Sequence, residues 1–186
     1  MVIVFSGKIV GKFVVEELGE VKVRYLMMED VDPLQDLMNS LVDEGADIRY
    51  TREIGFEEQV DWVAEQLKKV EKGKRVQLVV EVDGVVVGST SVERDEEGKD
   101  HVGHFGIVLA ESVRGFGVGE RTMRAVIEEA RERLDVEIVV LEVYESNEVA
   151  RNLYSKVGFE VVGRIEDGVC LEDGCSDVLI MEKKLK

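Results

Sequence analysis

The feature that most constrains the fold is a strand, a glycine-rich turn, a helix and a second strand, in succession between residues 101 and 144. Residues 101–110 and 137–144 are rich in Val, Ile and Leu, as buried strands are. Apolar residues recur between them at helical spacing, at Met123, Val126, Ile127, Ala130 and Leu134. A long helical connection between strands predicts a parallel crossover. The sequence therefore predicts a sheet with helices packed on it.

The flanking segments predict further strands and helices. Glycines interrupt a Val- and Ile-rich stretch over residues 2–28, which predicts two or three strands. A helix should begin at Asp32 as N-cap, with Pro33 at its first position, and end at Gly45. Further helices are expected at 56–72 and 148–157, and further strands at 76–82, 85–93, 159–168 and 176–185. The pair around Asp83-Gly84 should be a hairpin, so antiparallel pairs join the parallel crossover in a mixed sheet of an α/β domain.

The chain has 186 residues, one Pro and no linker-like run, so we expect one domain over 1–186. Its 24 Lys and Arg against 40 Asp and Glu give a net charge of −16, which argues against nucleic acid as a partner. The charge suits cationic partners such as amines, or it only keeps the surface solvated. No apolar run is long enough for a membrane span and no signal peptide is evident, which predicts a cytoplasmic protein. Asn and Gln total only seven residues, a bias of thermophile proteins.

The turn Arg114-Gly115-Phe116-Gly117-Val118-Gly119 lies between a strand and a helix. Successive backbone N–H groups and the helix dipole there form an anion site, and glycine lets a phosphate come close to the main chain. Residues 111–124 hold three Arg against two Glu, a locally positive segment. Glu120 occupies the third glycine position of a dinucleotide fingerprint, and no Gly-Lys-Ser/Thr of a P-loop follows. A merely flexible turn is the alternative.

Three further features follow this turn in register: Asn147, Leu153-Tyr154 and Gly158-Phe159. Together with Arg-x-x-Gly-x-Gly at 114–119 they resemble the GNAT superfamily of N-acetyltransferases, closest in pattern to the branch that acetylates ribosomal-protein alanines and protein lysines. The resemblance covers 76–185 in motifs and 22–72 in element order only. It implies a layered α-β-α fold (α+β in some schemes) whose mixed, mostly antiparallel sheet has about seven strands plus extra N-terminal strands. Residues 1–21, an N-terminal strand extension, precede the family's usual first strand and could pair between subunits or cover a sheet edge.

The resemblance also implies acetyl-CoA as co-substrate, without a metal. The family's pantetheine arm pairs like an added strand with the residues that are Ile107, Val108 and Leu109 in this chain, and its pyrophosphate lies in the turn of Arg114, Gly115, Phe116, Gly117, Val118 and Gly119. Asn147 would bond to the cofactor arm, cap the following helix, or do both.

Glu142 is the candidate base that accepts the amine proton. It is the one carboxylate in an otherwise apolar stretch of 138–144, and we expect burial to raise its pKa. Its position matches the catalytic glutamate of the ribosomal-protein alanine acetyltransferases. A structural carboxylate paired with a core arginine is the alternative, and Glu93 and His104 are alternative bases, acting directly or through water.

Tyr154 shares the apolar face of helix 148–157 with Val149, Ala150, Leu153 and Val157, which on pattern alone predicts a core residue. The resemblance implies instead that Tyr154 is the general acid that protonates the departing CoA thiolate and also contacts the cofactor.

Cys170 and Cys175 lie across a predicted turn and could form a disulfide, but we favour reduced thiols in a cytoplasmic protein. Two cysteines without a nearby His make a poor zinc site.

The function expected is direct transfer of an acetyl group to an amine of a basic protein or peptide, at its N-terminus or at a lysine, by a monomer or a homodimer without membrane or nucleic-acid partners. A small amine acceptor (polyamine, aminoglycoside or amino acid) and a non-catalytic CoA-binding module are the alternatives.

Overall fold

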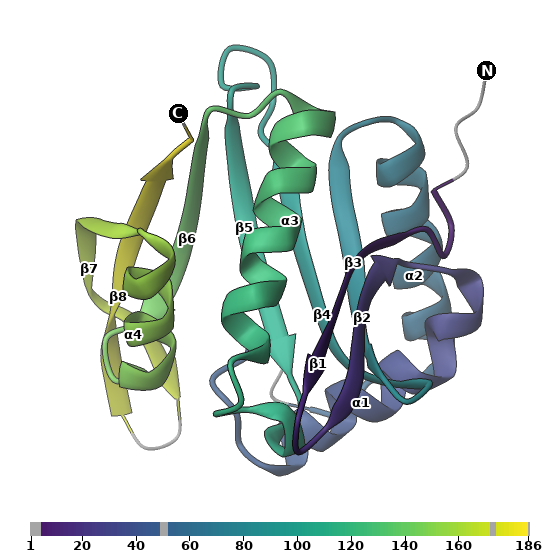
Figure 1. The fold of residues 1–186 in the computed structure, drawn as a ribbon. Coiled ribbons are helices and arrows are strands. Elements are labelled where there is room, and N and C mark those ends of the chain that lie inside the picture. The colour runs from purple at the N-terminus through teal and green to yellow at the C-terminus, as the bar shows by residue number, and fades with distance from the viewer. Residues whose placement is uncertain (1–4, 49–51, 172–173, 186) are drawn as a thin grey trace.

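An eight-stranded sheet with helices on both faces forms the part of the chain that the computed structural model describes, residues 5–48, 52–171 and 174–185 (Figure 1). The strands are β1 (Ile9–Val15), β2 (Gly19–Tyr25), β3 (Arg75–Val82), β4 (Val85–Arg94), β5 (Val102–Leu109), β6 (Ile138–Tyr144), β7 (Glu160–Leu171) and β8 (Gly174–Lys184). The helices are α1 (Val31–Asp43), α2 (Phe56–Glu71), α3 (Val118–Leu134) and α4 (Glu148–Val157). The strand order is β1-β2-β3-β4-β5-β6-β8-β7.

The mixed sheet predicted from the sequence is confirmed. Among the strands of the described residues, only β5 and β6 pair in parallel, joined through α3, and the other neighbouring strands are antiparallel. Helices α3 and α4 pack on the face turned toward the viewer in Figure 1, and α1 and α2 on the other face. The β3–β4 hairpin turns at Asp83 and Gly84, whose φ angles of 48° and 85° suit the expected two-residue turn.

The N-terminal segment covers a sheet edge, one of the two alternatives expected for residues 1–21. β1 pairs antiparallel with β2 and thereby becomes the edge strand in its place. Phe5 stacks on Tyr25 with ring centroids 4.9 Å apart, and the Tyr25 hydroxyl donates to Glu129 of α3 at 3.0 Å. These contacts tie Phe5, just before β1, to the core.

Helix α1 begins at Val31, earlier than the expected N-cap at Asp32, so that prediction is wrong. Asp30 is 2% exposed and accepts two bonds of 2.8 Å from the Arg24 guanidinium and one of 2.8 Å from the Met27 N–H. A buried carboxylate needs such partners, and here they fix the chain direction just before the helix. No helix in the described residues is long and apolar enough to cross a membrane.

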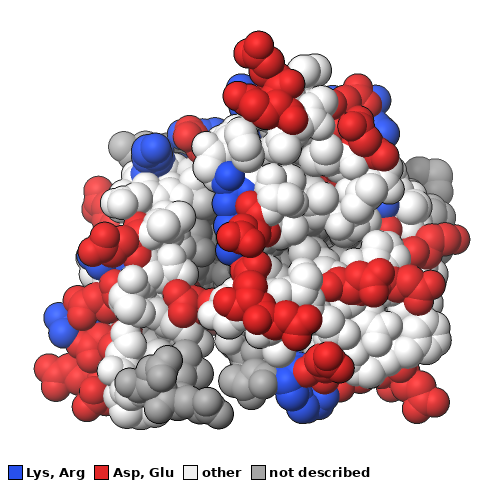
Figure 2. Space-filling model, turned by 90° about the horizontal axis from the view of Figure 1, so that it is seen from below, with Lys and Arg blue, Asp and Glu red and all other residues white. Residues whose placement is uncertain are grey.

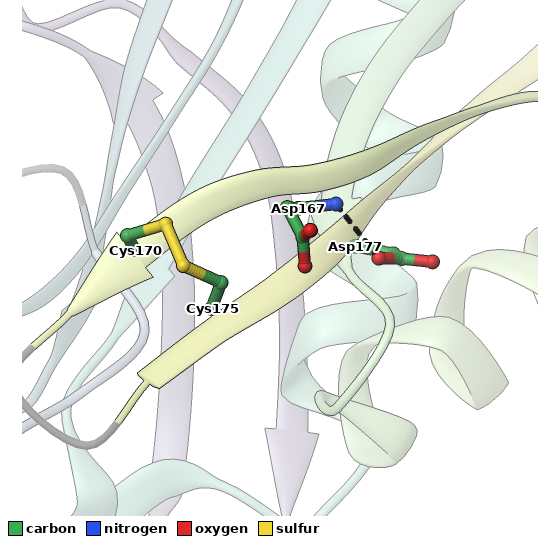
Figure 3. Close-up of a disulfide and its surroundings, with 4 residues drawn as sticks. All are labelled: Asp167, Cys170, Cys175 and Asp177. Carbon is green, nitrogen blue, oxygen red and sulfur yellow. Dashed lines mark hydrogen bonds between the residues drawn. A yellow bond between two sulfur atoms is a disulfide. The ribbon is translucent and has the colours of Figure 1, made fainter.

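The favoured reduced state of the two cysteines is also wrong for this structure: Cys170 and Cys175 form a disulfide (Figure 3). They are direct cross-strand partners of β7 and β8, with Cα atoms 4.0 Å apart. This proximity, set by strand register, allows the bond to form. Further along the hairpin the Asp167 N–H donates to Asp177 at 2.9 Å, so the strands stay linked within the register shift between Ile165 and Val169 (Figure 3).

Candidate functional site

The two parallel strands at the centre of the sheet diverge. β5 and β6 pair only where residues 102–104 face 138–140, after which the strands separate (Figure 1). On its other side β5 stays paired with β4 as far as Leu109. One edge of residues 105–109 therefore has no strand partner in the described parts of the chain, and its backbone groups can pair with an extended ligand.

A cavity of about 690 Å³ extends between the separated strands. Phe105, Gly106, Ile107 and Val108 of β5 line it on one side and residues 141–144 of β6 on the other. Helices α1 and α2 contribute further walls, and α4 contributes Asn147, at its N-cap, Ala150 and Tyr154. Of the residues predicted from the sequence, the cavity thus brings together Ile107, Val108, Glu142, Asn147 and Tyr154.

Tyr154 was expected either in the core or at the cofactor site. In the structure it packs against the core and also lines the cavity. Its ring centroid lies 6.1 Å from that of Phe105 and 6.3 Å from that of Phe159. Burial raises the pKa of the Tyr154 phenol to about 12. The hydroxyl therefore stays protonated at neutral pH and can donate a proton into the cavity. The expectation that Val149 shares this buried face is wrong, since Val149 is 78% exposed.

Glu142 lines the cavity but is exposed, so its expected burial is wrong. Along β6 the buried residues are Val139, Leu141 and Val143, and Glu142 points to the opposite face. That face is open here because β5 diverges from β6. The alternative of a core ion pair also fails, since Glu142 has no salt bridge with any residue the structure describes.

The two alternative bases do not line the cavity. Glu93 accepts from Arg75 and lies 2.8 Å from the Lys69 ammonium. Burial alone would raise the pKa of Glu93, but the bond from Lys69 and the charge of Arg75 hold it below its usual value. His104 has a side chain 59% exposed and bonds to Asp95 at 3.2 Å. Of the three candidate bases, Glu142 is thus the one that lines the same cavity as Tyr154.

The glycine-rich turn opens α3 in a conformation that favours glycine. Gly115 and Gly117 have φ of +84° and +77°, and a Cβ on either would meet no atom within 4 Å. Gly117 is the N-cap, so α3 begins without a side-chain cap on its first N–H groups. Gly119 packs close to α4, since its Cβ would lie 3.0 Å from Leu153 Cδ2. The turn thus presents free N–H donors next to open space, which fits a pyrophosphate.

The side chains of the turn leave less positive charge available to an anion than the sequence suggests. Val118 is completely buried, so only its backbone faces a ligand, and Phe116 is 41% exposed. The Arg114 guanidinium donates to the Leu109 carbonyl at 2.7 and 2.9 Å and pairs with Glu44. Arg124 pairs with Glu120 at 2.9 Å. The locally positive segment is therefore largely neutralised by neighbouring carboxylates.

A polar floor that sequence reasoning missed lies under the cavity. The Arg75 guanidinium donates to Gln77 Oε1 at 2.9 Å and to Ser91 Oγ at 2.7 Å, and Gln77 Nε2 donates to Ser89 Oγ at 2.9 Å. Gln77, Ser89 and Ser91 are buried. Polar residues at alternate positions of otherwise apolar strands were the available signal, since such a pattern marks a face that needs hydrogen-bond partners.

Asn147 is confirmed as the N-cap of α4, because its Oδ1 accepts from the Ala150 N–H at 2.9 Å. Since Asn147 also lines the cavity, the cap leaves its amide NH₂ available to a ligand.

The model of the Acetyltransferase (GNAT) family matches residues 36–159, two thirds of the sequence. The chain belongs to this family.

Among curated proteins, the L-amino acid N-acetyltransferase AaaT of Escherichia coli (strain K12) is 35% identical over 88 residues, 47% of this chain and 54% of the relative. The match therefore spans about half the relative's length. Among solved structures, the ribosomal-protein-alanine N-acetyltransferase from Brucella melitensis has a TM-score of 0.77 and 27% identity, covering 88% of this chain and 99% of that one. RimL, a ribosomal L7/L12 alpha-N-protein acetyltransferase solved with coenzyme A, has a TM-score of 0.82 at 16% identity, covering 96% and 98%. At this identity the likeness to RimL shows a shared fold.

Proposed function

We propose that this chain is an acetyl-CoA-dependent N-acetyltransferase that moves an acetyl group directly to a primary amine, the N-terminal or lysine amine of a protein. The observation that carries the proposal is the unpaired edge of β5 beside a cavity that holds Glu142 and Tyr154. Family membership supports the same reaction.

Acetyl-CoA would lie along β5, its arm beside Ile107, Val108 and Leu109 and bonded to the backbone groups that point away from β4. The Leu109 carbonyl there already accepts from Arg114. Its pyrophosphate would accept bonds from the N–H groups of the turn 114–119, and the Asn147 amide would donate to the arm. The residues fit this group, because the β5 edge is free of a strand partner in the described chain and the start of α3 has no side-chain cap. RimL, which shares the fold, was solved with coenzyme A.

In the reaction the amine nitrogen attacks the carbonyl carbon of the thioester, and the carbon–sulfur bond breaks. Glu142, directly or through one water, accepts the proton that the amine loses, and Tyr154 gives its proton to the sulfur. A neutral amine is needed, and the ordinary pKa of a lysine is about 10.4, so a base contributes most for a lysine acceptor. A phenol that stays protonated suits the acid role.

The acceptor is the less constrained part of the proposal. Two similar structures bear names of ribosomal-protein acetyltransferases, which favours a protein amine. The curated relative is named for L-amino acids, and a cavity of about 690 Å³ suits a small amine as well. We keep the small amine as the second candidate, and propose a cytoplasmic protein without nucleic-acid partners.

The test is thiol release from acetyl-CoA by the purified chain with a panel of peptides and small amines, together with mass spectrometry of a protein lysate incubated with isotopically labelled acetyl-CoA. We expect thiol release that depends on the amine, and labelled peptides at N-terminal or lysine amines. A chain that binds acetyl-CoA but releases thiol with no amine would contradict the enzyme and favour a binding module.

A further inference from the structure

The walls of the cavity carry a strong negative charge. Its described lining contains five carboxylates and one guanidinium; the carboxylates are Asp47, Glu58, Asp61, Glu65 and Glu142. The guanidinium, Arg75, is held by Glu93, Gln77 and Ser91. Seen from below, Asp and Glu side chains also gather along the central hollow of the molecule (Figure 2). The carboxylates of the described lining therefore outnumber its cationic groups, so a cationic ligand can pair with those that remain.

Three of these carboxylates form a stripe on α2. Glu58, Asp61 and Glu65 follow at spacings of three and four residues, which places them on one side of a helix over about 10 Å. The ends of the stripe are paired, Glu58 with Arg52 at 3.0 Å and Glu65 with Lys69 at 3.4 Å. Asp61, between them, has no salt bridge within the described chain.

A second, independent observation points to a ligand at the same wall. Gln59 is only 3% exposed and lines the cavity, yet its side-chain amide makes no hydrogen bond to any residue the structure describes. The amide atoms of Gln59 are not among the fully buried unpaired side-chain atoms of the described chain, so they reach the open space of the cavity and are free to bond to a ligand there. Gln59 does not face Asp61, since residues two apart lie on different sides of a helix, but it lies three residues before Trp62, which lies three residues before Glu65. A polar ligand at Trp62 could therefore reach the Gln59 amide.

Trp62 completes this wall. It is half-buried, lines the cavity and lies four residues after Glu58, so its indole faces the same side of α2 as the stripe. An indole face attracts cations within about 6 Å of its centre. Carboxylates beside an aromatic ring and a free amide suit an ammonium or guanidinium group.

We propose that the α2 wall, formed by Asp61 with Gln59, Trp62 and Glu65, is a subsite for a second cationic group of the acceptor, distinct from the amine that reacts. The proposal rests on the proposed acetyltransferase function and deepens it. The reacting amine must be neutral to attack, so it gains little from carboxylates, whereas a second ammonium stays charged throughout. The acceptor is then a dication: a peptide amine with a neighbouring Lys or Arg, or a small diamine.

The first test measures binding without turnover. Calorimetry on the full chain compares 1,4-diaminobutane with butylamine, and the peptide Ala-Lys-Ala-Gly with Ala-Gln-Ala-Gly, all without acetyl-CoA. We expect each dication to bind at least about tenfold more tightly than its singly charged partner. Equal binding of both pairs overturns the subsite even if amines are acetylated. Selective binding without thiol release supports the subsite and instead contradicts the enzyme. The peptide and diamine arms show which source of the second charge is preferred.

The second test removes the charge. Asp61→Asn should reduce the preference for dications about tenfold, measured as the ratio of the dissociation constants, or of kcat/KM, for 1,4-diaminobutane and butylamine. Glu57→Gln is the matched control, an exposed carboxylate on α2 outside the cavity. An equal effect of both variants would mean a general field rather than a subsite, and would overturn the proposal. Thermal unfolding of both variants checks that the fold is intact.

Discussion

Tyr154 can be tested by removing one oxygen. In Tyr154→Phe the ring contacts with Phe105 and Phe159 remain, and the hydroxyl makes no hydrogen bond to described residues, so stability should change little. Without its proton donor, kcat should fall about 100-fold while KM for acetyl-CoA stays within about threefold. Steady-state kinetics check both. Tyr25→Phe, which also removes a buried hydroxyl but lies outside the cavity, should keep its turnover.

The raised pKa of Tyr154 sets a pH dependence with a definite sign. An unfolded tyrosine ionises near pH 10, whereas the folded phenol ionises near 12. Its contribution to stability is present below pH 10 and is lost as pH rises to about 12. The acid should therefore still be protonated at pH 10. If the wild-type kcat falls by half between pH 9 and 10 but that of Tyr154→Phe does not, the assigned pKa is wrong.

Glu142→Gln tests the base. The substitution keeps the shape of an exposed side chain, so the fold should persist, and kcat for a lysine acceptor should fall about 100-fold at pH 7. The loss should shrink as pH approaches the amine's own pKa, because neutral amine then forms without a base. A pH series of kcat for the variant and for Glu148→Gln, an exposed carboxylate outside the cavity, measures this. If the ratio of the kcat of Glu142→Gln to that of the wild type is the same at all pH values, Glu142 is not the base.

For single residues, the sequence predicts which side chains are candidates for the site better than it predicts whether they are buried or exposed. Strand alternation correctly places Glu142 opposite Val139 and Leu141. Whether that face is covered depends on where β5 leaves β6, and no local pattern reports the divergence of two strands more than 30 residues apart. The unpartnered amide of Gln59 and the stripe on α2 were missed for the same reason: they matter only because the cavity lies beside them.

At the scale of elements, the β7–β8 hairpin carries a testable crosslink. Its cysteines are five residues apart, and closing so short a loop stabilises a fold by about 2 kcal/mol on the chain-entropy account. Reduction should therefore lower Tm by about 4–8 °C in a protein of this size. Turnover should hardly change, because β7 and β8 do not line the cavity in the described chain. Calorimetry with and without a thiol reductant measures the shift.

The matched variant for the crosslink is the double substitution Cys170→Ser and Cys175→Ser. Its Tm should equal that of the reduced protein and should not change when the reductant is added. Two titratable thiols in the untreated native protein would show that the bond does not form in solution.

Periodicity predicted all four α-helices of the described chain and the parallel crossover, because a helix that packs on a sheet must repeat its apolar face. It did not predict the two short 3-10 helices, Met28–Asp30 and Glu111–Val113. Ends were harder to predict. The start of α1 depends on Arg24 reaching Asp30, and the disulfide depends on the register of β7 with β8. Both are pairings between elements, which residue preferences along one element do not encode.

At the scale of the whole molecule, the net charge of −16 acts on the two substrates in opposite directions. Sequence counting suggested a positive segment at 111–124, but Glu44 and Glu120 neutralise Arg114 and Arg124. The net charge then makes the field of the molecule negative at long range. It should repel anionic acetyl-CoA, which the N–H groups proposed at the turn would hold only at contact, and attract a cationic acceptor from a distance.

Salt separates these two effects because the Debye length falls from about 30 Å at 0.01 M to about 10 Å at 0.1 M. Over that range kcat/KM for a dicationic acceptor should fall about threefold, with acetyl-CoA saturating, while kcat/KM for acetyl-CoA should rise by a similar factor with the acceptor saturating. A fall in both would mean that salt weakens the enzyme itself. A fall for acetyl-CoA alone would mean that the turn at 114–119 attracts phosphate from a distance despite its paired arginines. Opposite slopes are expected only if the acidic surface guides the acceptor while contact with the backbone selects the cofactor.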